Sequence, residues 1–185
     1  MEAFAISTLV VAVAEVGDKT QLLSLLLGAR FGRPWPIVAG IAVATVFNHF
    51  LAGFAGVMVA RLVGPDLLRY GLAASFVLMG LWLLRPDQVD EEEGRRQYGG
   101  VFLTSLVLFF LAEMGDKTQI ATAALGARYD PLWAVVVGTT LGMLIANVPV
   151  VFGGEWLMQR VPVKWVQRAA ALLFIGLGGW TLLSG

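Results

Sequence analysis

A seven-residue motif occurs twice in this chain and places charged side chains inside runs that are otherwise apolar. The copies span residues 15–21 and 113–119, and each reads Glu, an apolar residue, Gly, Asp, Lys, Thr and Gln. An Asp or Lys at the centre of a bilayer is disfavoured by roughly 2.5–3.5 kcal/mol on insertion scales. Within a membrane, these ionisable residues would therefore need mutual pairing, water or a bound ion.

The surrounding sequence is that of a membrane protein. Hydrophobic residues make up 58% of the 185 residues and charged residues only 14%, whereas soluble domains have about a quarter charged. Apolar runs long enough to cross a bilayer recur along the chain. The sequence predicts an all-α integral membrane protein with six transmembrane helices. We place these spans at residues 3–29, 35–61, 67–84, 101–127, 131–158 and 165–183.

Several classes of protein and site are excluded. The chain has no cysteine, so neither disulfides nor thiolate metal sites are available. Its net charge is zero, which removes any electrostatic case for nucleic-acid binding. Residues 1–30 lack the basic start of a signal peptide and are interrupted by the first motif. We expect them to be a retained first span.

The two halves of the chain are copies of each other. A shift of 98 positions superimposes the two motifs and places residues 27–30 on residues 125–128, both Leu-Gly-Ala-Arg. Because each copy holds three predicted spans, an odd number, the second copy must enter the bilayer from the opposite face. We therefore predict two inverted three-helix repeats, residues 1–84 and 100–185, joined by an acidic linker at residues 85–99.

The lysines and arginines of the predicted loops indicate the orientation. The side with both termini carries three of them, and the other side carries eight. Because basic loops stay inside, the acidic linker is expected in the cytoplasm and both termini outside. The linker is most simply a solvated connection; the alternative is an acidic surface that gathers cations.

The motif has a definite geometry if it forms one continuous helix. Glu15 and Asp18 would be neighbours on one face, with Lys19 four residues from Glu15 and Gln21 three from Asp18. Thr20 would point away from this face. Gly17 would permit either close helix approach or a local break that frees backbone carbonyls as ligands.

The inverted repeat would bring the acidic residues of both copies together near mid-membrane. We predict four metal ligands there, Glu15, Asp18, Glu113 and Asp116. Carboxylates form an all-oxygen site suited to calcium, magnesium or manganese, whereas zinc and copper prefer nitrogen or sulfur. Four carboxylates against the two motif lysines leave two negative charges, which one divalent cation neutralises. Protons are the natural replacement when the metal leaves, which predicts cation/proton exchange.

Other polar residues are expected to support this site. In the motifs they are Gln21, Gln119, Lys19, Lys117, Thr20 and Thr118. Outside the motifs, the shift of 98 pairs His49, the only histidine, with Asn147. Both could line the ion path, with His49 also a proton carrier; the alternative is a buried polar residue bonded to a carbonyl. Pro149 is expected to loosen the fifth span beside the site.

Three other interpretations compete with a metal site. The Glu and Lys of each motif could form salt bridges that only serve helix packing, at a desolvation cost that apolar residues would avoid. A small-solute exporter, for example of basic amino acids, could use the same carboxylates. An intramembrane aspartyl protease could use Asp18 and Asp116 as a catalytic pair, but that leaves the other charged residues of the motifs unexplained.

The doubled Glu-x-Gly-Asp-Lys-Thr, in two three-span halves joined by an acidic linker, resembles the signature of the Gdt family of cation/proton exchangers. The resemblance covers nearly the whole chain. It implies about six helices, no cofactor, and export of manganese, with calcium also handled by eukaryotic members. It also implies that Glu15, Asp18, Glu113 and Asp116 are the cation ligands. The missing amino-terminal extension of eukaryotic members favours a multi-pass protein of the bacterial inner membrane. The partners expected are lipid, divalent cation and protons, with the oligomeric state left open.

Overall fold

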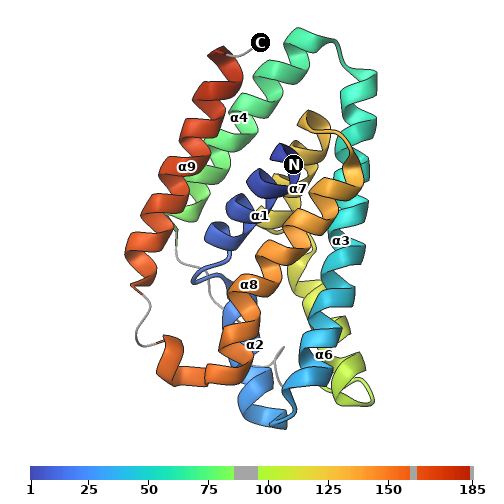
Figure 1. The fold of residues 1–185 in the computed structure, drawn as a ribbon, viewed down its shortest axis with the longest axis vertical. Helices are drawn as coiled ribbons and strands as arrows, with labels where there is room; N and C mark the ends of the chain where they lie inside the picture. Colours follow the sequence, from blue (N-terminus) through green and yellow to red (C-terminus); the bar gives the residue numbers. More distant parts are fainter. Residues whose placement is uncertain (86–95, 159–161, 184–185) are drawn as a thin grey trace.

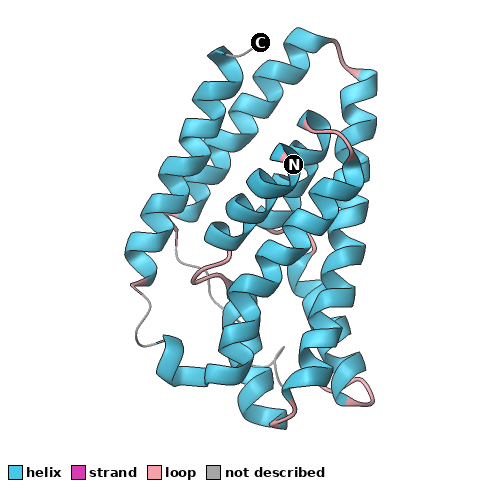
Figure 2. Ribbon diagram, viewed as in Figure 1, coloured by secondary structure: helices cyan, strands magenta, loops and turns pink. Residues whose placement is uncertain are grey.

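The chain folds into helices joined by loops, as the computed structural model shows (Figures 1 and 2). The structure describes residues 1–85, 96–158 and 162–183, so most of the predicted acidic linker lies outside the described residues. The all-helical prediction is confirmed within these ranges. The helices are α1 (Glu2–Ala14), α2 (Lys19–Phe31), α3 (Pro34–Leu62), α4 (Pro65–Leu83), α6 (Val101–Glu113), α7 (Lys117–Arg128), α8 (Leu132–Met158) and α9 (Val163–Leu183).

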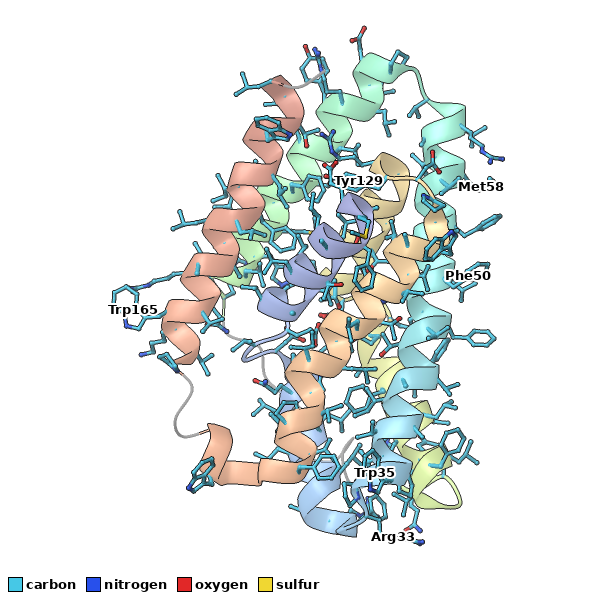
Figure 3. The ribbon with its side chains drawn as sticks, in the orientation of Figure 1. Arg33, Trp35, Phe50, Met58, Tyr129 and Trp165 are labelled. Atoms are coloured by element: carbon cyan, nitrogen blue, oxygen red, sulfur yellow. The ribbon has the colours of Figure 1, made fainter. Side chains whose placement is uncertain are left out.

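Four of these helices are long and apolar enough to cross a membrane. They are α3, α4, residues 132–154 of α8, and α9, and they correspond to the predicted second, third, fifth and sixth spans. Apolar side chains also cover the outer surface: Figure 3 shows Phe50 on the outside of α3 and Trp165 pointing away from α9. The chain is therefore a multi-pass membrane protein. The exact number of six spans stays a prediction.

The first and fourth predicted spans are each two helices instead of one. Residues 15–18 separate α1 from α2, and residues 114–116 separate α6 from α7. In each break a motif glycine has a left-handed backbone, with φ of 79° at Gly17 and 76° at Gly115. Glycine adopts this conformation without the steric cost that other residues meet. The continuous motif helix is thus wrong, because both glycines lie in a break. Gly17 also permits the close approach of α9, since a Cβ there would clash with Val163.

Helices from the two halves interleave. The short helices α1 and α2 pack on α8, while α6 and α7 pack on α3, and α4 lies beside α9 (Figure 1). Tight contacts use small residues: a Cβ added at Gly56 of α3 would clash with the Ala123 carbonyl of α7. Between α4 and α9, the buried rings of Phe76 and Phe174 lie 6.3 Å apart. This packing buries the acidic residues at both helix breaks, although Met114 and Gly115 of the second break remain exposed.

The helix α8 departs from regular geometry at one end. It contains Pro149, and the backbone leaves helical φ and ψ at Gly154, with φ 55° and ψ −147°. Proline removes a backbone donor and commonly accompanies bends in long helices. The departure lies towards the end of α8 that is distant from α1.

Candidate cation site

Three acidic side chains meet where the two broken helices face each other. Glu15 follows the last residue of α1, Glu113 is the last residue of α6, and Asp116 precedes the first residue of α7. Glu15 and Glu113 are fully buried, and Asp116 is 3% exposed. Each offers an oxygen, and these oxygens lie within 4.8 Å of one another. We call these three residues the carboxylate cluster.

The carboxylate cluster has oxygens that no hydrogen bond satisfies. Among the described residues, Glu15 Oε1, Glu113 Oε1 and Asp116 Oδ2 are buried and have no hydrogen-bond partner. Burying carboxylate oxygens in this way is costly unless a cation or a proton neutralises them. The orphaned oxygens are therefore available to bind a positively charged species.

The motif threonines hold the two glutamates. Thr20 Oγ1 donates a hydrogen bond to Glu15 Oε2, at 2.5 Å, and Thr118 Oγ1 donates to Glu113 Oε2, at 2.9 Å. The sequence-based expectation that Thr20 points away from the acidic side chains is wrong. It assumed a continuous helix, whereas the break at Gly17 turns the start of α2 towards Glu15.

The motif lysines pair across the two copies. Lys19 Nζ lies 3.2 Å from Asp116 Oδ1, and Lys117 Nζ lies 2.8 Å from Asp18 Oδ1. The intrahelical geometry considered from the sequence, such as Glu15 with Lys19, is wrong, because the break places the two residues on opposite sides of it. The Lys117 side chain is 4% exposed and that of Lys19 28%. The fourth predicted ligand, Asp18, thus pairs with a lysine beside the cluster.

The motif glutamines accept hydrogen bonds from backbone N–H groups at the breaks. Gln21 Oε1 accepts a hydrogen bond from the Gly17 N–H at 2.8 Å, and Gln119 Oε1 accepts one from Gly115 at 2.7 Å. These N–H groups lie outside regular helix and need such partners. Gln21 Nε2 also donates to the Ala146 carbonyl of α8, at 3.0 Å. The glutamines therefore support the shape of the site.

The residues predicted on the second and fifth spans lie opposite the two glutamates. From α8, Asn147 Nδ2 lies 3.5 Å from Glu15 Oε2, and Ser24 Oγ donates to Asn147 Oδ1 at 2.7 Å. From α3, His49 Nε2 lies 3.8 Å from Glu113 Oε2. Both side chains are fully buried. The structure thus brings His49 and Asn147 to the site, as their pairing in the sequence indicated.

Sequence reasoning missed two residues that hold Asn147. Ser24 is one, and Met143, whose carbonyl and Sδ lie 3.1 and 3.0 Å from Asn147 Nδ2, is the other. Ser24 carried a signal, because the shift of 98 pairs it with Thr122, another hydroxyl residue in an apolar run. Met143 carried none, since a buried methionine in an apolar helix is ordinary.

The arrangement resembles a discontinuous-helix ion site in its chemistry. Carboxylates sit at the broken ends of α1 and α6, where backbone carbonyls of the last helical turn lack helical partners. Such ends are suited to bind cations, and the adjoining starts of α2 and α7 favour negative charge. The site can therefore hold a cation or exchange it for protons.

Comparison with known proteins identifies the family. Residues 3–91 and 101–185 match the family model of GDT1, described as "Divalent cation/proton antiporter GDT1". A Vibrio cholerae protein described as "Putative manganese exporter" is 51% identical over 176 residues, which are 95% of this chain and 88% of that protein. "GDT1-like protein sll0615" of Synechocystis is 30% identical, over 94% of this chain and 93% of its own.

More distant similarity extends to plants. "GDT1-like protein 4" of Oryza sativa subsp. indica is 29% identical over 95% of this chain and 71% of its own length. No solved structure matches this chain.

Proposed function

Because this chain belongs to the GDT1 family of divalent cation/proton antiporters, we propose that it exports manganese in exchange for protons through the carboxylate cluster. Membership of a transporter family also excludes the protease interpretation. The manganese exporter description of the Vibrio cholerae relative supports the choice of metal and a place in the bacterial inner membrane.

The carboxylate cluster is the observation that carries the proposal. One oxygen from each residue lies within 4.8 Å of the other two, and one oxygen of each residue has no hydrogen-bond partner among the described residues. Oxygen ligands in this number suit a hard divalent cation. The four motif carboxylates and two lysines sum to two negative charges, so one divalent cation or two protons neutralise the whole. Metal and protons then alternate at one site.

Alternating access explains the fourth carboxylate. If the halves are inverted repeats, the opposite-facing state exchanges their conformations. The cluster of Glu15, Glu113 and Asp116 then becomes its equivalent, in which Asp18 replaces Asp116. The lysines exchange roles as well. In the opposite-facing state Lys117 takes the place at the cluster that Lys19 has in this structure. Each aspartate serves as a ligand in one of the two states.

The test is transport by the purified protein in proteoliposomes. With an outwardly or inwardly directed proton gradient, we expect manganese to move against the proton flow, with calcium or magnesium tested alongside. Arginine and lysine uptake tests the alternative of a basic amino-acid exporter. Transport of amino acids that does not depend on a divalent cation would contradict the proposal.

A further inference from the structure

His49 stands out among the side chains around the carboxylate cluster. It is fully buried on α3, and its Nε2 faces Glu113. Neither ring nitrogen has a hydrogen-bond partner within the described residues. Buried polar groups in proteins are almost always hydrogen-bonded, so an imidazole left in this state calls for a bound species as its partner.

The distance between the ring and the glutamate fits a shared ion. Nε2 and Glu113 Oε2 are 3.8 Å apart, which is too long for a hydrogen bond. An octahedral ion that holds its ligands at about 2.1 Å spaces neighbouring ligand atoms about 3.0 Å apart and opposite ones about 4.2 Å apart. The observed separation lies between these two values. The separation therefore allows one ion between His49 and Glu113. His49 lies outside the group of oxygens that are within 4.8 Å of one another, so the imidazole would have to move towards Glu15 and Asp116 to share their ion.

The equivalent position in the other half has no side-chain nitrogen without a hydrogen-bond partner among the described residues. The shift of 98 places Asn147 at the position of His49, and Asn147 Nδ2 lies 3.5 Å from Glu15 Oε2. Its amide is already held, because Ser24 donates to its oxygen and Met143 accepts from its nitrogen. At these two equivalent positions, as far as the described residues show, His49 has ring nitrogens without a hydrogen-bond partner and Asn147 does not.

On the basis of the proposed function, we propose that His49 binds the transported cation through Nε2, and that this nitrogen makes the site prefer manganese to calcium and magnesium. Calcium and magnesium take oxygen ligands, whereas imidazole suits transition metals. The carboxylates alone form the all-oxygen site expected from the sequence, which would admit all three ions. The added nitrogen is the discriminating ligand.

Pulsed electron paramagnetic resonance tests the contact directly. Bound Mn²⁺ is paramagnetic, and a directly bound imidazole modulates its spin echo. Because the chain has a single histidine, an imidazole signal identifies His49, provided that purification avoids a polyhistidine tag. We expect a ¹⁴N modulation that changes on ¹⁵N-histidine labelling and is lost in His49→Asn. Bound Mn²⁺ with no histidine-dependent modulation would overturn the inference.

Transport selectivity gives a second readout. His49→Asn installs the residue that the other half already carries, and His49→Gln serves if that variant does not fold. The ratio of manganese to calcium kcat/KM does not depend on protein amount, and we expect it to fall by about tenfold or more. The neighbouring Asn48→Ala is the matched control. The Asn48 amide nitrogen already donates a hydrogen bond to the Phe110 carbonyl, at 3.1 Å, so Asn48 is not expected to bind the cation and the ratio should not change.

The outcomes separate this inference from the proposed function. An unchanged ratio in both histidine variants, with normal transport by the unsubstituted protein, would overturn the role of His49 and leave cation export intact. An equal loss of kcat/KM for manganese and calcium would show that His49 acts in proton transfer or in the structure. That result would also overturn the inference that His49 selects the metal. Absence of divalent cation transport by the unsubstituted protein would contradict the proposed function itself.

Discussion

The Lys117 ammonium lies 2.8 Å from a carboxylate oxygen of Asp18, so the lysine of one motif pairs with the aspartate of the other. Lys19 makes the equivalent contact with Asp116, at 3.2 Å. These reciprocal pairs join the two halves of the chain beside the carboxylate cluster. They also mean that a cation that binds Asp116 competes with an ammonium group already there.

We expect Lys19→Gln to tighten metal binding and slow turnover. Removing this ammonium makes the empty cluster more negative, so a divalent cation binds more strongly, by roughly tenfold, and leaves less readily. Metal titration and transport KM and kcat measure the two effects. Lys164→Gln, an exposed lysine at the start of α9, is the control. Weaker metal binding by Lys19→Gln would contradict competition between the lysine and the metal.

Lys117→Gln should instead destabilise the protein. Both side chains of the Lys117 and Asp18 pair are at most 4% exposed, and removing one partner of a buried pair costs about 3–5 kcal/mol. The double variant Asp18→Asn with Lys117→Gln should recover much of this loss while remaining unable to transport. Thermal unfolding in detergent measures the stability of Lys117→Gln, of Asp18→Asn and of the double variant. Additive losses in the double variant would show that the pair is not coupled.

Asp116→Asn and Asp18→Asn should each abolish transport, by different routes. Asp116 belongs to the carboxylate cluster in this structure, so its neutral variant should bind metal at least about tenfold more weakly. Asp18 is assigned to the opposite-facing state, so Asp18→Asn should keep more metal binding yet fail to complete the cycle. Binding and transport assays at equal protein amounts distinguish the two. Near-normal transport by either variant would contradict the proposal that all four motif carboxylates are needed for transport.

The glycines at the two breaks should differ in their tolerance of a side chain. Both have left-handed φ, which costs a non-glycine residue about 1–2 kcal/mol. A Cβ at Gly17 would also clash with Val163 of α9, whereas a Cβ at Gly115 meets nothing within 4 Å. Gly17→Ala should therefore lower the melting temperature more than Gly115→Ala. Equal losses in the two variants would show that the contact with α9 has little energetic weight.

The sequence was most informative where composition and repetition decide the outcome. The apolar runs around His49 and Asn147 predicted long helices, and α3 and α8 are such helices. The shift of 98 also paired these two residues, and each lies opposite a motif glutamate, His49 near Glu113 and Asn147 near Glu15. Acidic residues in apolar runs located the site, since their burial needs a partner.

The sequence was least informative inside the motif. Helical spacing placed Glu15, Lys19 and Thr20 relative to one another, and a single left-handed glycine between them altered every one of those relations. Glycine in an apolar helix is compatible with either tight packing or a break, so the residue type alone could not choose. The pairing of Lys19 with Asp116 depends on how two segments distant in the sequence pack together. The spacing of residues within one motif carries no information about that packing.

The central claim is that one buried site exchanges a divalent cation for protons. The most direct measurement follows manganese and internal pH together in proteoliposomes of the purified protein, under an imposed proton gradient and in its absence. We predict that manganese moves opposite to the protons, that manganese alone drives proton movement when no pH gradient is imposed, and that acidic pH on both sides weakens manganese binding because protons occupy the same carboxylates. Manganese transport without accompanying proton movement, or manganese binding that does not change with pH, would contradict the account.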